Sequence, residues 1–205
     1  MKTVNAICFI VITATFASLS SHAQTRDARP FKLWLDCGAG YSRNISPGVA
    51  ATAIPGGDHT NGGFTGLIRM RGSRNNFITI GLETGWLHLS SVSQQNAQTN
   101  GYGTTNINAT LSAIPVMGVV TLQDYDVQLH GSVGLYRLIS TASLFGNTVT
   151  SSEWDMAFTL AAGYEIMLPD EFELVPEFRW TRINDQQKSF LSILLRVQFP
   201  PWIPF

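Results

Sequence analysis

The chain has 205 residues, with 13 Lys and Arg against 14 Asp and Glu, and a formal net charge of −1. This balance excludes a nucleic-acid-binding protein that relies on a basic surface. Only 13% of the residues are charged, against about 25% in typical soluble domains. With two cysteines, one of them in the N-terminal apolar segment, a disulfide framework is also excluded.

The first 23 residues have the layout of a secretory signal peptide. Lys2 precedes an apolar run from Ala6 to Leu19, and the small-residue site Ser21-His22-Ala23 follows it. We expect cleavage after Ala23, which removes Lys2 and leaves one exported domain, residues 24–205, with 12 basic and 14 acidic residues. An uncleaved N-terminal anchor helix is the alternative. The rest of the sequence has no apolar run long enough for a membrane helix.

Apolar residues recur at every second position along most of the remaining chain, which predicts β-strands. In the first such segment, Leu33 and Leu35 alternate with Lys32 and Asp36. The pattern leaves open which face of segment 107–121 is the apolar one, and Pro176 predicts a bulge or locally lost pairing. Eight strands are expected, at about 31–43, 63–71, 77–90, 107–121, 127–139, 153–167, 172–181 and 189–199.

The links between these strands alternate in length. Long links rich in Ser, Thr, Asn and Gly are expected at 44–62, 91–106 and 140–152, and short ones at 72–76, 122–126 and 168–171. Short periplasmic turns and longer outer loops are typical of outer-membrane barrels. The sequence therefore predicts an all-β fold, an eight-stranded antiparallel up-and-down transmembrane β-barrel in the outer membrane. The alternative is a secreted β-sandwich.

The more polar face of the strands carries both signs of charge in equal number. An eight-stranded barrel has an interior just wide enough for its own side chains, and buried charges must be paired. We therefore expect a side-chain-filled lumen in which opposite charges pair; the alternative is solvated positions on a soluble protein. The predicted network consists of Lys32, Asp36, Arg69, Arg71, Glu83, Asp155, Glu165, Glu177, Arg179 and Arg196.

Six stretches carry a family resemblance: the signal ending HAQ, then KLWLDCGAGYS, LSAIPVMGVV, FTLAAGYEIML, ELVPEFRWT and SFLSILLRVQF. They resemble the small eight-stranded outer-membrane barrels of the OmpA/OmpX-like superfamily, and more closely the outer membrane protein β-barrel domain of Bacteroidetes-type bacteria, including the PorT type. The resemblance covers nearly all of residues 24–205 and implies a barrel or porin-like protein without assigned chemistry.

The closing strand alternates and ends at Phe199, and the resemblance implies that the barrel assembly machinery reads such a strand as its insertion signal. Phe205 is the last residue, but Pro200, Pro201 and Pro204 prevent the ladder from continuing to it. Either Phe199 or Phe205 is therefore the signal, and Phe199 fits the strand better. The other expected partners are outer-membrane lipid and lipopolysaccharide, and the closed barrel is expected to be a monomer.

One candidate for catalysis is the pair His88 and Ser90. Some lipid A deacylases are eight-stranded barrels with a His-x-Ser pair, and a His close to a Ser can activate it as a nucleophile. The acid of that family is missing at its expected spacing, where Tyr102 stands. His59 has no second metal ligand at a useful spacing, and we expect no cofactor and no metal.

These patterns lead to one expected function and two alternatives. We expect a non-enzymatic barrel with a structural or surface-interaction role. The first alternative is a lipid A-modifying hydrolase that uses His88 and Ser90. The second is an accessory barrel of a protein secretion system, on fold-level analogy alone.

Overall fold

The computed structural model describes residues 31–46, 58–74, 77–99, 103–184 and 188–201. The predicted signal peptide and Phe205 lie outside these residues. The described part contains two short strands, β2 (Asp58–Thr60) and β8 (Ile166–Met167), and a 3-10 turn, Pro169–Glu171. Its eight long strands are β1 (Lys32–Asn44), β3 (Gly62–Ser73), β4 (Ile78–Thr99), β5 (Gly103–Asp124), β6 (Val127–Leu144), β7 (Asn147–Tyr164), β9 (Glu173–Ile183) and β10 (Lys188–Gln198).

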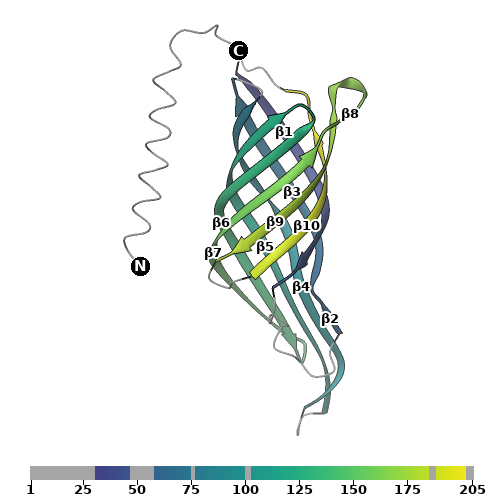
Figure 1. The fold of residues 1–205 in the computed structure, drawn as a ribbon. Coiled ribbons are helices and arrows are strands. Elements are labelled where there is room, and N and C mark those ends of the chain that lie inside the picture. The colour runs from purple at the N-terminus through teal and green to yellow at the C-terminus, as the bar shows by residue number, and fades with distance from the viewer. Residues whose placement is uncertain (1–30, 47–57, 75–76, 100–102, 185–187, 202–205) are drawn as a thin grey trace, which may run out of the picture. The chain divides into compact units, whose positions relative to one another are not determined.

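The long strands pair antiparallel in chain order and the sheet closes on itself (Figure 1). Closure comes from β1, which pairs with β3 on one side and with β10 on the other, from Asp36↔Gln198 to Asn44↔Phe190. The predicted antiparallel up-and-down barrel is therefore confirmed. No helix in the described ranges has the length and hydropathy needed to span a bilayer.

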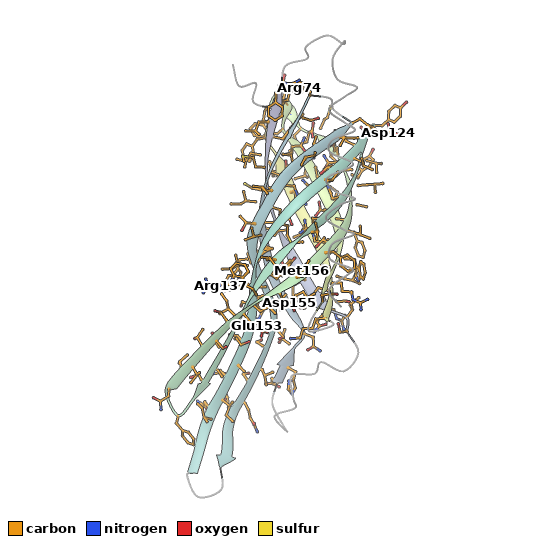
Figure 2. All side chains as sticks on the ribbon, turned by 90° about the vertical axis from the view of Figure 1, so that its left-hand side faces the viewer. Arg74, Asp124, Arg137, Glu153, Asp155 and Met156 are labelled. Carbon is orange, nitrogen blue, oxygen red and sulfur yellow. The ribbon has the colours of Figure 1, made fainter. Side chains whose placement is uncertain are left out.

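The two ends of the barrel differ in construction. Arg74 and Asp124, in or beside two short turns, lie together at one end (Figure 2). The first residue of β1 and the last of β10 lie at this end as well, so we call it the terminal end. At the opposite end, the far end, β4, β5, β6 and β7 continue beyond the other strands as a protruding sheet (Figures 1 and 2).

The protruding sheet corrects two predicted loops, 91–106 and 140–152. Most of these residues belong to strands, because β4 and β5 pair out to Thr99↔Gly103 and β6 and β7 pair out to Leu144↔Asn147. A tight turn joins β6 to β7 through Phe145 and Gly146, whose φ angles of 51° and 77° suit a two-residue hairpin. The sequence did not predict these strand segments because polar residues occupy both faces of the protruding sheet. Apolar and polar residues therefore do not alternate along them.

Along each strand of the barrel, side chains point alternately outward and into the lumen. Strand β5, whose face the sequence left open, turns Met117 and Val119 inward and Val116 and Val120 outward. The outward face is a band of exposed apolar side chains, which marks a surface that contacts lipid rather than water. The band includes Leu35, Tyr41, Ile68, Met70, Leu82, Val133, Leu135, Phe158, Leu160, Ile193 and Leu195.

Two prolines lie where the ladder is interrupted, because proline has no N–H to donate. The β4–β5 ladder skips Pro115, passing from Thr84↔Val116 to Leu87↔Ala113. Strand β9 pairs with β7 up to Gly163↔Glu177, and the ladder continues only with β8 beyond Pro176. The locally lost pairing predicted at Pro176 is therefore present.

Candidate functional site

Two carboxylates form the centre of a buried ion-pair network inside the barrel. Glu83 on β4 receives Arg69 of β3 and Arg179 of β9, each with a nitrogen 2.6 Å from a Glu83 oxygen. Glu177 on β9 pairs with Arg179 at 2.9 Å, with Arg196 of β10 at 2.8 Å and with Arg69 at 3.4 Å. All five side chains are almost completely buried.

Arg196 joins this centre to a second cluster nearer the terminal end. Its Nη1 lies 2.8 Å from Asp36 of β1, and the Nε of Arg71 lies 3.1 Å from the same carboxylate. Arg71 also donates to the side-chain oxygen of Gln198, and Arg196 donates to Gln128 at 2.7 Å. The network therefore crosses the lumen between strands that are distant in sequence.

His130 of β6 fills the space between the two clusters. Its ring nitrogens lie 2.7 Å from Thr121 Oγ1 and 3.2 Å from Glu177 Oε2, and Arg69 and Arg196 approach the ring at 3.2 and 3.0 Å. Buried charges are tolerated only when partners of opposite sign and hydrogen bonds compensate for the lost water. In the two clusters each carboxylate meets two or three arginines.

The structure places nine of the ten predicted network residues inside the barrel. Seven of them form the two clusters just described. Glu165 instead accepts hydrogen bonds from Gln123 and Gln128, and Asp155 is buried opposite Tyr136 on β6. Lys32 is only half-buried, at the mouth of the terminal end. Gln128, His130 and Gln198 also contact the arginines of the network. They are absent from the predicted network because its members were selected by charge among the inward positions.

An apolar layer also fills the lumen, from the level of Glu83, whose register partner is Met117, toward the far end. Inward side chains from seven strands pack there, and those of Leu87, Phe190 and Ile183 are at most 1% exposed. A conducting path would have to pass both this layer and the ion pairs. The packed cluster comprises Leu67, Leu87, Leu89, Ala113, Met117, Val119, Tyr136, Leu138, Ala157, Ile183, Phe190 and Leu194.

Each end of the lumen holds a cavity. The far-end cavity has a volume of about 330 Å³ and is lined mainly by small and hydroxyl side chains, with Lys188 as its charged residue. The terminal-end cavity has a volume of about 410 Å³, and Lys32, Trp34, Glu171 and Glu173 contribute to its wall. The two cavities have no lining residue in common.

His88 and Ser90 are not arranged as a catalytic pair. The register of β4 and β5 passes from His88↔Ser112 to Ser90↔Leu111, so Leu89 is an extra residue, a β-bulge. Ser90 lines the far-end cavity, whereas the His88 ring packs against Gly63. In the part of the chain that the structure describes, the two side chains form no hydrogen bond with each other.

The protruding sheet has two properties that matter for contact with other molecules. In the described part, residues 147–152 of β7 have a strand partner only on the β6 side, because pairing with β9 begins at Ala157. The sequence from Leu89 to Gln123 and from Leu138 to Ser152 contains no Asp, Glu, Lys, Arg or His. Ser, Thr, Asn and Gln dominate it.

Comparison with known families identifies the fold's relatives. The family model described as "Outer membrane protein beta-barrel domain" matches residues 9–199. The chain belongs to this family. It is therefore an outer-membrane β-barrel protein of a Gram-negative bacterium. No curated protein matches the sequence.

Solved structures with the same fold have very different sequences. The attachment invasion locus protein Ail of Yersinia pestis, in complex with the heparin analogue sucrose octasulfate, has 12% identity and a TM-score of 0.54, over 83% of this chain and 99% of Ail. A major outer membrane protein of Thermus thermophilus has 11% identity and a TM-score of 0.50, over 84% of this chain and 99% of that protein. At such identity the likeness shows the fold alone.

Membership of the family also orients the barrel. Outer-membrane barrels have short turns on the periplasmic side and their longer connections outside. By this rule we assign the terminal end, with its short turns, to the periplasmic side and the protruding sheet to the outside of the cell. The apolar band lies between them, in the bilayer.

Proposed function

We propose that this barrel has no transport or catalytic role and that its function is to present the protruding sheet to another protein outside the cell. The observation that carries the proposal is the outer edge of β7 from Asn147 to Ser152, which has no strand partner on that side among the described residues. A strand edge exposes a row of N–H and C=O groups that can pair with a further strand.

Natural proteins protect such edges with Lys, Pro, inward charges or bulges. Residues Asn147–Ser152 contain none of these residue types, and β7 pairs with β6 without a register shift along this stretch. The added strand would continue outward from where β9 ends at Ile183 and would run antiparallel to β7. We infer that the partner supplies an extended, uncharged segment.

The filled lumen supports the non-transport part of the proposal. Ion pairs around Glu83 and Glu177 and the apolar layer around Phe190 occupy the space that a channel would need. The barrel then serves to anchor the protruding sheet in the membrane. The closing strand β10, which Phe199 follows directly, is proposed to direct its insertion.

A synthetic strand tests edge addition directly. A fluorescent peptide with the sequence LISTASL copies residues 138–144, which pair with β7 on its other side. We expect the full-length protein in detergent micelles to raise the anisotropy of this peptide. A charged side chain on the edge, Thr150→Lys, should weaken binding at least tenfold, whereas Thr110→Lys, which is also exposed but lies on the interior strand β5, should not.

The controls decide between edge addition and non-specific adsorption. Equal binding by both lysine variants would mean that the peptide does not use the edge. No binding by the unmodified protein would remove the edge of β7 as a docking site, and the proposal with it.

A further inference from the structure

Four strands, β1, β4, β6 and β9, run from the terminal end toward the far end. On three of them the apolar band is followed by an exposed arginine. On β1, Tyr41 in the band is followed two residues later by Arg43, and on β6 Leu135 is followed by Arg137. Strand β9 repeats the spacing with Trp180 and Arg182. A spacing of two keeps each arginine on the lipid-facing side of its strand.

The three arginines are exposed at the upper limit of the band. Arg137 lies between Ile114 of β5 and Trp154 of β7 in the sheet register, and Figure 2 shows it on the outer surface, near the level where the protruding sheet leaves the barrel. Arg182 is the register partner of Phe158, whose ring packs edge-on against Trp180 with centroids 5.2 Å apart. Aromatic residues mark the interfaces of outer-membrane barrels, so these arginines lie at the depth of the lipid headgroups.

Among the described residues, carboxylates do not accompany the arginines on this face. Glu153 and Asp155 flank Trp154 on β7 but share the opposite face with Leu138 and Tyr136, which point into the lumen. Asp58 lies further out, on β2, which pairs with β4 beyond the band. At the terminal end, by contrast, exposed Asp124 and Asp126 lie in one of the turns.

From this asymmetry we infer that Arg43, Arg137 and Arg182 bind the phosphate groups of phosphorylated glycolipid headgroups in the outer leaflet. Guanidinium groups match phosphate oxygens with two parallel hydrogen bonds and stay charged at every physiological pH. The spread of the three arginines over β1, β6 and β9 allows more than one headgroup to be held. The fourth outward strand has His88 after Trp86, half-buried rather than exposed.

The test uses the purified full-length protein in micelles of a zwitterionic detergent. Lipid A with both phosphates, or dephosphorylated lipid A, is titrated in, and bound lipid is counted by native mass spectrometry. We expect binding of the phosphorylated form. The triple variant R43Q/R137Q/R182Q should weaken it about 100-fold, since each basic residue near a charged membrane surface contributes about fivefold.

A matched control removes an arginine at the other end of the same barrel. Arg74 is exposed beside a periplasmic turn, so Arg74→Gln should leave lipid A binding unchanged. Equal binding of dephosphorylated lipid A, an unaltered affinity in the triple variant, or an equal loss in Arg74→Gln would each overturn the inference. Heat-dependent gel mobility checks that every variant is folded.

Discussion

Glu177 forms ion pairs with three arginines, more than any other carboxylate of the network described above. Glu177→Gln leaves those guanidinium groups buried with one compensating charge fewer. Breaking a buried ion pair by removing one partner typically costs about 3–5 kcal/mol. We expect the free energy of unfolding, measured by urea titration in lipid vesicles, to fall by this order. Asp124→Asn, at an exposed turn carboxylate, should change it by less than about 0.5 kcal/mol.

Two glycines make a matched pair that tests strand packing at the seam of the barrel. A Cβ on Gly40 would overlap the backbone of Ile193 and Leu194, whereas a Cβ on Gly131 would meet nothing within 4 Å. Gly40→Ala should therefore destabilise the barrel by about 1–3 kcal/mol, and Gly131→Ala should be close to neutral. Similar unfolding midpoints for the two variants would contradict the close approach of β1 and β10.

The variant His88→Ala tests whether the pair His88 and Ser90 hydrolyses lipid A. The ring of His88 packs against Gly63, and among the described residues it forms no hydrogen bond with Ser90, so His88→Ala should leave the acylation pattern of lipid A in the producing strain unchanged. Mass spectra of extracted lipid A would show this directly. An acyl chain that is lost in the presence of the unmodified protein and kept with the variant would establish the hydrolase instead.

At the scale of elements, the outer halves of β6 and β7 are expected to serve contact rather than stability. Ile139 and Ser152 are register partners, so residues 140–151 can be replaced by Asn-Gly, which favours a two-residue hairpin turn. The shortened protein should keep the heat-dependent gel mobility of the full-length barrel and lose binding of the LISTASL peptide. A barrel that no longer folds would show that the protruding sheet stabilises it.

The sequence predicted the parts of the strands that lie within the bilayer but not their continuations outside it. Both results have one physical reason. Lipid on one face and a filled lumen on the other impose alternation, as in Leu129, Val133 and Leu135 against Gln128 and His130. Beyond the membrane both faces of the sheet are polar, so Thr141–Leu144 looks like a loop. The inward position of Arg179 followed from alternation, but its contact with Glu83, 96 residues away, depends on register around the whole barrel.

The whole molecule is a closed and filled barrel that carries a protruding sheet at its far end. The ion-pair clusters and the apolar layer together occupy the lumen. Insertion into a bilayer is therefore expected without any conductance. The same filled interior predicts a barrel that resists detergent until heated, visible as a mobility difference between unheated and boiled samples.

The most direct measurement is the ionic current through purified full-length protein in planar lipid bilayers, with the mobility shift used to verify that the inserted protein is folded. We predict bilayers that contain folded protein and stay electrically silent. Steady single-channel currents from the same preparation would contradict the filled lumen and would make transport, rather than presentation of the outer sheet, the function to pursue.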